Sequence, residues 1–124
     1  MPQPVVLITG AAGGLGSALA QRFAAGGWRV AAADVNAAGL HSLSNALPLA
    51  ASVTIDLRSA SNCQELLSQV LARTGRLDAL INAAGVWREG PVESFSEEDF
   101  DLLMDVNVKA AFFACAAAIP HLRD

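Results

Sequence analysis

The chain has 124 residues, of which 53% are hydrophobic and 16% are charged, and its formal net charge is −4. This length supports one domain with its own core, and the composition argues against disorder. A negative net charge without a basic cluster argues against nucleic acid or an anionic membrane surface as a partner.

The sequence predicts strands that alternate with helices along the whole chain. In chain order, the expected elements are a strand over residues 5–9, a helix that ends near Ala25, a strand over 28–33, a helix over 37–46, a strand over 51–55, a helix from a cap at Ser61 to Gly75, a strand over 77–81 and a helix over 96–118. The strands are mostly apolar runs, which is typical of a parallel sheet covered on both faces. This order predicts a Rossmann-type, doubly wound α/β fold in three α/β/α layers, with strand order 3-2-1-4. We interpret residues 1–124 as a single domain.

Residue types suggest how the helices begin, end and pack. Ser61 and Gln64 have capping-box spacing, so Ser61 is the expected N-cap of its helix. Ser96 is the expected N-cap of the last helix, and Pro120 should lie beyond the end of that helix. The first helix is expected to bury the side chains that recur at helical spacing, namely Leu15, Ala18, Leu19 and Phe23.

A glycine-rich segment over residues 9–16 joins the first strand to the first helix. Glycine lets the backbone turn sharply and approach a phosphate without a Cβ in the way. The start of the helix then offers unpaired N–H groups and the positive end of its dipole. We interpret Gly10, Gly14 and Gly16 as shaping the pyrophosphate loop of a dinucleotide site, and the alternative is a turn with a purely structural role.

Asp34 lies at the end of the second strand, after the glycine segment. A carboxylate there can accept hydrogen bonds from both hydroxyls of the adenosine ribose, and it would repel a 2′-phosphate. No Arg or Lys lies in the glycine segment or directly after Asp34 to neutralise such a phosphate. The sequence therefore favours NAD over NADP, unless Asp34 is an ordinary surface residue of a turn.

At these positions the chain resembles the short-chain dehydrogenase/reductase family. The spacing from Thr9 and Gly10 to Gly14, Leu15 and Gly16 is that family's version of the glycine fingerprint. The resemblance covers the whole chain and places these five residues at the cofactor. It implies an NAD-dependent oxidoreductase that moves a hydride between the nicotinamide and a secondary alcohol or ketone.

Three further motifs carry the resemblance and the roles that it implies. Asp56 and Leu57 match the pair that contacts the adenine in the family. Asn107 matches the Asn of the catalytic tetrad, which helps to hold a water in the proton relay. The segment after the fourth strand, where an alanine replaces the family's second Asn, is implied to lie beside the cofactor and consists of Asn82, Ala83, Ala84 and Gly85.

Asn107 can also be interpreted without the family. It shares one face of its helix with apolar residues, which are Phe100, Leu103, Met104 and Ala111. An amide on an apolar face costs free energy unless it is hydrogen-bonded. Asn107 should therefore have a structural partner, a bound water or a functional role.

The sequence contains no tyrosine. The family's general acid/base is the Tyr of a Tyr-x-x-x-Lys motif, supported by an upstream Ser, and we expect all three residues beyond Asp124. The chain would then be the N-terminal portion of a longer enzyme, or one half of a split one, and would not be catalytically competent alone. The alternatives are a non-catalytic dinucleotide-binding module and an inactive truncated fragment.

The remaining expectations concern the setting and the partners. Cys63 and Cys115 lie among apolar neighbours with no second ligand at metal-site spacing, so we expect core residues, no metal and a reducing, cytoplasmic environment. The start of the chain lacks a basic n-region, and the apolar run over 110–119 is about half of what a bilayer requires, so neither a signal peptide nor a membrane contact is expected. The helix around this run is apolar nearly all round, which favours a homo-oligomer contact in a complete enzyme.

Overall fold

The computed structural model describes residues 2–122. The strands are β1 (Val5–Thr9), β2 (Arg29–Asp34), β3 (Ala51–Thr54) and β4 (Ala79–Asn82). The helices are α1 (Gly14–Ala25), α2 (Ala37–Ala46), α3 (Ala60–Thr74), α4 (Glu97–Met104) and α5 (Ala110–Leu122), with a short 3₁₀ turn η1 (Val92–Ser94) and a π-turn η2 (Asp105–Lys109). The predicted order of strands and helices is confirmed, with strand ends displaced by one or two residues.

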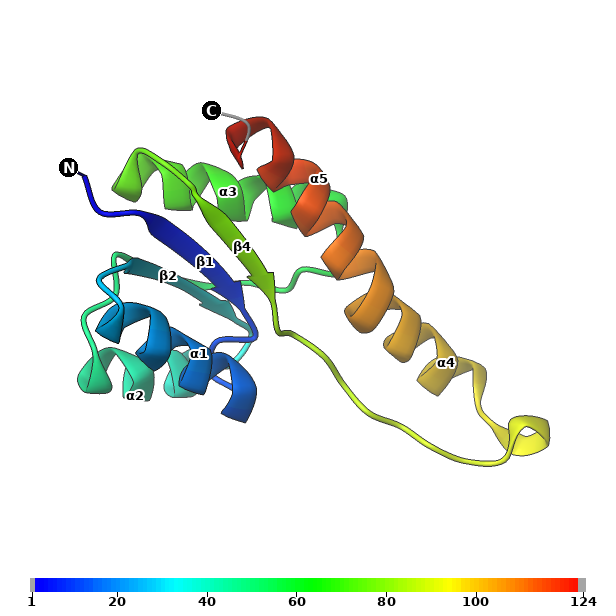
Figure 1. Cartoon of the computed structure of the whole chain (residues 1–124). Helices are drawn as coiled ribbons and strands as arrows, with labels where there is room; N and C mark the ends of the chain where they lie inside the picture. Colours follow the sequence, from blue (N-terminus) through cyan, green and yellow to red (C-terminus); the bar gives the residue numbers. More distant parts are fainter. Residues whose placement is uncertain (1, 123–124) are drawn as a thin grey trace.

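The four strands form one parallel sheet in the order β3-β2-β1-β4, as predicted. Helices α1 and α2 cover one face of the sheet, and α3 and α5 cover the other (Figure 1). Successive β1 residues serve the two layers in turn: Val6 and Ile8 pack with α1 and α2, whereas Val5 and Leu7 pack with α3 and α5. This division explains why β1 is apolar throughout instead of alternating, since a strand covered on both faces needs no polar side.

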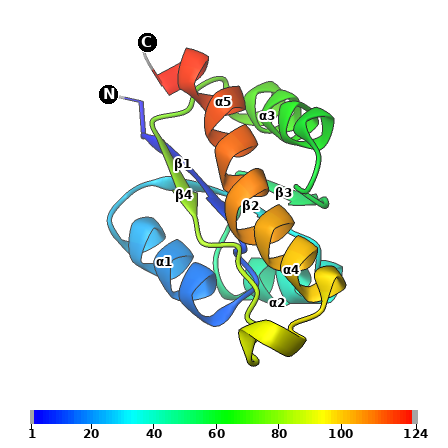
Figure 2. The ribbon, with the colours of Figure 1, turned by 90° about the vertical axis from the view of Figure 1, so that its right-hand side faces the viewer.

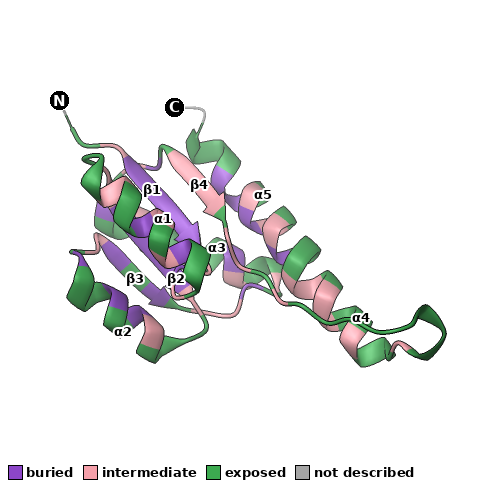
Figure 3. Ribbon diagram, turned by 60° about the horizontal axis from the view of Figure 1, so that its bottom comes forward, coloured by how far each residue is buried: buried purple, intermediate pink, exposed green. Residues whose placement is uncertain are grey.

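The burial pattern places the core inside these layers. The central strands β1 and β2 are buried, and the outward sides of the helices are exposed (Figure 3). The predicted face of α1 is wrong in part, because Leu15 is 68% exposed and Ala18 is exposed, although Leu19 and Phe23 pack against the core. Gly16 and Ala20 are the buried residues of α1. A helix that touches the sheet through small residues turns its larger first-turn side chain outward.

The caps of the helices explain where each begins. Asn36 caps α2, and Ser96 caps α4 as predicted. The cap of α3 is Ser59, whose Oγ accepts a hydrogen bond of 3.1 Å from the N–H of Asn62. The predicted cap at Ser61 is therefore wrong: Ser61 already lies inside the helix, where its hydroxyl cannot take the N-cap position.

The last predicted helix consists of α4 and α5 joined by the π-turn η2, and it continues past its predicted end. Pro120 lies inside α5, which ends at Leu122. A proline removes one backbone hydrogen bond, and in the last turn of an exposed helix end that loss is small because water can replace the bond. The prediction that Pro120 lies beyond the helix is therefore wrong.

The continuous helical run Glu97–Leu122 has 26 residues and a mean hydropathy of 1.7 in its most apolar part, which is 22% buried. By length and composition alone, this run could cross a membrane, and core helices of soluble proteins also meet these two criteria. The run is longer than the apolar stretch over residues 110–119, from which the sequence analysis expected no membrane contact. Figure 2 shows α4 and α5 as one long rod, with α5 beside α3. On its packed side, Ala114 and Ala118 belong to the core shared with α3, while Phe112 is 67% exposed.

Candidate functional site

The structure contains a hollow of about 570 Å³ where the carboxyl ends of the four strands meet the loops that follow them. In open parallel sheets this is the edge at which ligands bind, and the volume is typical of a small-molecule site. The loops after all four strands contribute to its wall. The predicted site residues that line it are Gly10, Asp34, Asp56, Leu57, Ala83, Ala84 and Gly85.

The glycines of the segment after β1 differ in the space around them. Gly10 has φ +64°, and a Cβ on it would lie 2.5 Å from the Cα of Ala84. A Cβ on Gly16 would lie 2.1 Å from the carbonyl oxygen of Gly10. A Cβ on Gly14 would have no atom within 4 Å. Gly10 and Gly16 are therefore required by the packing of the protein itself, whereas the space beside Gly14 is open to a ligand.

The start of α1 is the one long-helix start of the described residues that lacks a side-chain cap. Its N-cap, Gly13, has no side chain to accept from the first-turn N–H groups, and the first turn carries no acidic residue. Side chains cap α2, α3 and α4, and α5 continues from the π-turn. Unpaired N–H groups and the positive dipole end of α1 thus remain available to an anionic group. This arrangement fits the phosphates of a dinucleotide.

Asp34 fastens the glycine segment to the end of β2. Its Oδ2 accepts a hydrogen bond of 3.0 Å from the N–H of Ala12, and its Oδ1 accepts one of 2.9 Å from the N–H of Asn36. A carboxylate offers about four acceptor positions, so roughly two remain free. Asp34 can therefore hold the loop and still accept hydrogen bonds from a ligand in the hollow that it lines.

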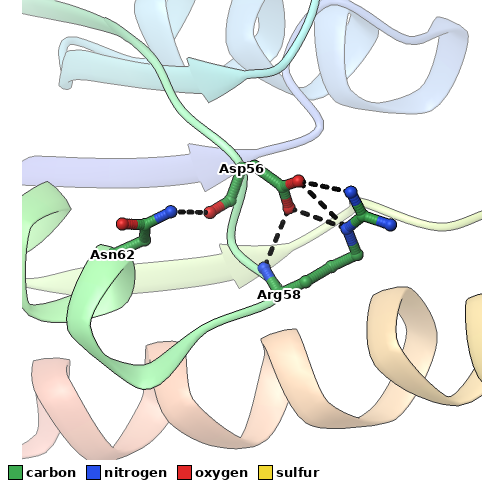
Figure 4. A network of polar contacts seen from close by, with 3 residues as sticks. All are labelled: Asp56, Arg58 and Asn62. Carbon is green, nitrogen blue, oxygen red and sulfur yellow. Dashed lines mark hydrogen bonds and ion pairs between the residues drawn. The ribbon is translucent and has the colours of Figure 1, made fainter.

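Asp56 is paired with Arg58, two residues further on (Figure 4). Its Oδ1 accepts from the backbone N–H and the Nε of Arg58, and its Oδ2 accepts from Nε and, at 2.6 Å, from Nη2. These hydrogen bonds from the Arg58 side chain hold the pKa of Asp56 below its usual value. The amide of Asn62 donates to the backbone carbonyl of Asp56 at 2.7 Å, which ties the loop to the start of α3.

Asn107 lies in the π-turn and forms a reciprocal pair with the loop after β4. Its Oδ1 accepts from the N–H of Val86, and its Nδ2 donates to the carbonyl oxygen of Val86, both at 2.9 Å. The partner that the sequence required for this amide is thus main chain. Asn107 does not line the hollow, but Val86 does, so Asn107 positions one of the walls.

Five other predicted residues are not among those that line the hollow. Thr9 is 1% exposed and donates a long hydrogen bond of 3.5 Å from Oγ1 to the carbonyl of Ile81, which joins β1 to β4. The amide of Asn82 donates to the sulfur of Cys115 at 3.4 Å. The remaining three form the start of α1 and are Gly14, Leu15 and Gly16.

Sequence reasoning missed several residues of the wall. Arg58 could have been found, because a cation two residues after Asp56 on the same loop is a visible pairing signal. Leu102, Val106 and Ala110 come from the α4–α5 run, and only the tertiary packing brings them to the loops of the sheet. Within residues 2–122 no group of His, Cys, Asp and Glu side chains is arranged to hold a metal ion.

Comparison with known proteins identifies what this arrangement is similar to. The family model described as short chain dehydrogenase matches residues 4–124. D-threitol dehydrogenase of Mycolicibacterium smegmatis is 38% identical over 117 residues, which cover 91% of this chain and 45% of the relative. Cis-1,2-dihydrobenzene-1,2-diol dehydrogenase of Pseudomonas putida is 38% identical over 125 residues, which cover 95% of this chain and 45% of the relative.

Among solved structures, the 3-ketoacyl-(acyl-carrier-protein) reductase from Brucella melitensis complexed with NADH matches with a TM-score of 0.89 at 30% identity. The match covers 97% of this chain and 50% of that structure's chain. The chain therefore spans about half the length of the relatives that it matches.

Proposed function

The chain belongs to the short-chain dehydrogenase family, and from this premise we propose that it forms the NAD-binding part of an oxidoreductase acting on a secondary alcohol or ketone. When bound, the dinucleotide supplies or accepts the hydride. The observation that carries the proposal is the uncapped start of α1, which adjoins a hollow that also holds the carboxylate of Asp34. The names of the two curated relatives, a threitol and a dihydrodiol dehydrogenase, support an alcohol substrate.

In this proposal the N–H groups at the start of α1 bind the pyrophosphate. Gly10 and Gly16 let the loop fold tightly, and the open space beside Gly14 admits the phosphate oxygens. Backbone donors suit this task because they are fixed by the helix and need no reorganisation when the anion arrives. The loop that contains Ala83 and Ala84 closes the hollow beside Gly10.

The carboxylate of Asp34 is proposed to select NAD. Its free acceptor positions would take the two hydroxyls of the adenosine ribose, and a 2′-phosphate there would be repelled by like charge. The two main-chain N–H groups that Asp34 already accepts from fix the position of the carboxylate.

Asn107 is proposed to act as a positioning residue. Both ends of its amide are engaged with Val86, so its side chain holds the loop after β4 in place. The second N–H of its amide remains for the water that the family's proton relay would require. The chain has no tyrosine, so we place the proton donor of the reaction outside these 124 residues.

The variant Asp34→Arg tests the cofactor assignment. Titration of the intact protein with NAD and with NADP should show weaker NAD binding and a relative shift toward NADP, by about tenfold or more in the ratio of the two Kd values. Asp101→Arg is the matched control, since Asp101 is an exposed carboxylate on α4 that does not line the hollow. An unchanged ratio in Asp34→Arg would refute the assigned ribose contact. Turnover of an alcohol by the 124 residues alone would contradict the placement of the proton donor.

A further inference from the structure

We propose that Asn62, in the first turn of α3, is a positioning residue for the loop after β3, and that it raises the affinity for the dinucleotide without touching it. The inference rests on the proposed dinucleotide site and on the adenine contact that the family resemblance implies for Asp56 and Leu57. Asn62 does not line the hollow, whereas Asp56 and Leu57 do. Asn62 therefore acts on the ligand through the main chain of this loop.

The loop after β3 leaves the sheet before it reaches the hollow. Strand β3 ends at Thr54, and the N–H of Ile55 donates to the carbonyl oxygen of Asp34 at 3.0 Å. Strand β3 is also the outermost strand on its side of the sheet that the described residues form. Residues 56–58 must therefore be held in place by contacts other than pairing with a neighbouring strand.

The ion pair of Asp56 with Arg58 shapes this loop but does not attach it to the rest of the protein, because both partners belong to the loop. Arg58 gives three hydrogens to the carboxylate, from its backbone N–H, from an Nε–H that both oxygens share and from Nη2. A carboxylate offers about four acceptor positions, so about one remains free for a donor of the ligand. The place of that free position depends on how the loop is attached.

Asn62 supplies this attachment. Its Nδ2 donates to the carbonyl oxygen of Asp56 at 2.7 Å (Figure 4). The N–H of Asn62 donates to Oγ of Ser59 at 3.1 Å, so the backbone that carries the amide is fixed by the helix cap. A second contact is weaker, since the thiol of Cys63 donates to the carbonyl oxygen of Leu57 at 3.5 Å and thiols are weak donors. The amide of Asn62 is thus the stronger of these two links between the loop and α3.

Helix α3 is a suitable anchor because it is part of the core. Its side chains Cys63, Leu66 and Leu67 are buried in the layer that α3 shares with α5. A binding group held by a rigid element loses little freedom when the ligand arrives, which favours affinity. Without the amide of Asn62, the carbonyl of Asp56 would turn to water, and the loop would sample positions in which its carboxylate no longer faces the hollow.

Two variants separate positioning from helix stability. Asn62→Ala and Asn62→Asp both remove the donor, because alanine has no polar group and an ionised carboxylate only accepts. Both replacements suit the helix, since alanine is a better helix former than asparagine and a carboxylate in the first turn favours the helix dipole. We expect a Tm within about 4 °C of the native value for both variants. The Kd for NAD should nevertheless rise about three- to tenfold.

A second dinucleotide shows where the affinity is lost. In the analogue that carries purine instead of adenine, only the 6-amino group is missing, and calorimetry on the intact protein measures both ligands without turnover. The native protein should bind NAD more tightly than the analogue, because Asp56 can accept from the amino group. Both Asn62 variants should bring the ratio of the two Kd values close to one, whereas a general loosening of the fold would weaken both ligands alike.

The matched control for charge is Gln64→Glu, which adds the same charge to an exposed position of α3 that does not line the hollow. It should leave both Kd values unchanged. The proposal is overturned if Asn62→Ala binds NAD as the native protein does, or if it weakens both dinucleotides with their ratio unchanged. An equal loss in Gln64→Glu and Asn62→Asp, with none in Asn62→Ala, would reveal a charge effect and also overturn it. Failure of the proposed function is distinguishable, because the native protein would then bind neither dinucleotide.

Discussion

Replacing Gly14 by alanine separates the role of the glycine segment in folding from its role in binding. A Cβ on Gly14 meets no atom within 4 Å, so the fold has room for it. Gly14 is the first residue of α1, and alanine favours a helix over glycine by up to about 1 kcal/mol in helix interiors, so the free energy of unfolding should stay equal or rise by a few tenths of that. The methyl group would, however, occupy the open space beside the first N–H groups of the helix.

The expected result is a protein that is as stable as the native one but binds NAD about tenfold or more weakly, which corresponds to about 1.4 kcal/mol. Gly16→Ala is the contrasting variant, because its Cβ would lie 2.1 Å from the carbonyl oxygen of Gly10 and the backbone must move. Such overpacking costs about 1–3 kcal/mol and should lower Tm by several degrees. Thermal unfolding and NAD titration of the intact protein give both quantities. Gly14→Ala that binds NAD as tightly as the native protein would refute a phosphate at the start of α1.

Three further outcomes can be checked with single variants or reagents. Asn107→Ala removes both hydrogen bonds to the loop after β4 and should cost about 1–3 kcal/mol and accelerate amide exchange in that loop; unchanged exchange would contradict a positioning role. Ser59→Ala should cost about 1 kcal/mol in denaturant unfolding and Ser61→Ala close to nothing, and the reverse order would show that the cap is misassigned. Because burial raises the pKa of the Cys63 thiol, the folded protein at pH 8 should be alkylated at Cys115 first, and Cys63 should react only as the pH rises further or on unfolding; equal rates would contradict this.

The layered architecture was accessible from the sequence because its signals are redundant. The β1 residues are apolar on both faces, and Gly75 ends α3 in the left-handed conformation that its position demands. These features are local, so they predicted the succession of strands and helices along the chain, and the order of strands within the sheet followed from the fold type that this succession indicates. One error arose where two local signals competed, because Ser59 and Ser61 are both possible caps of α3. Another arose in α1, where Gly16 packs so closely on the backbone of Gly10 that the neighbouring Leu15 points to solvent instead of the core.

The candidate site was accessible only where the backbone itself forms it. The glycine segment and Asp34 could be placed because the ends of parallel strands meet at one edge. The contribution of Val106 could not, because it depends on tertiary packing, whereas the pairing of Arg58 with Asp56 had a signal in their two-residue spacing that was overlooked. The amide of Asn107 illustrates the limit: its need for a partner was predictable, but Val86 as that partner was not.

The π-turn η2 determines how α5 is rotated about the helix axis relative to α4. An α-helix turns by about 100° per residue, and a π-turn fits about one more residue into its turn. If the same residues between Asp105 and Lys109 formed a regular α-helix, α5 would therefore rotate relative to α4 by about that angle. Either Val106 would lose its place at the loops of the sheet, or Ala114 and Ala118 of α5 would lose their packing against α3. The π-turn therefore lets one helical run keep two contacts that a regular α-helix of the same residues would not allow together. Val106 faces the hollow at the loops of the sheet, and the buried alanines of α5 pack on α3.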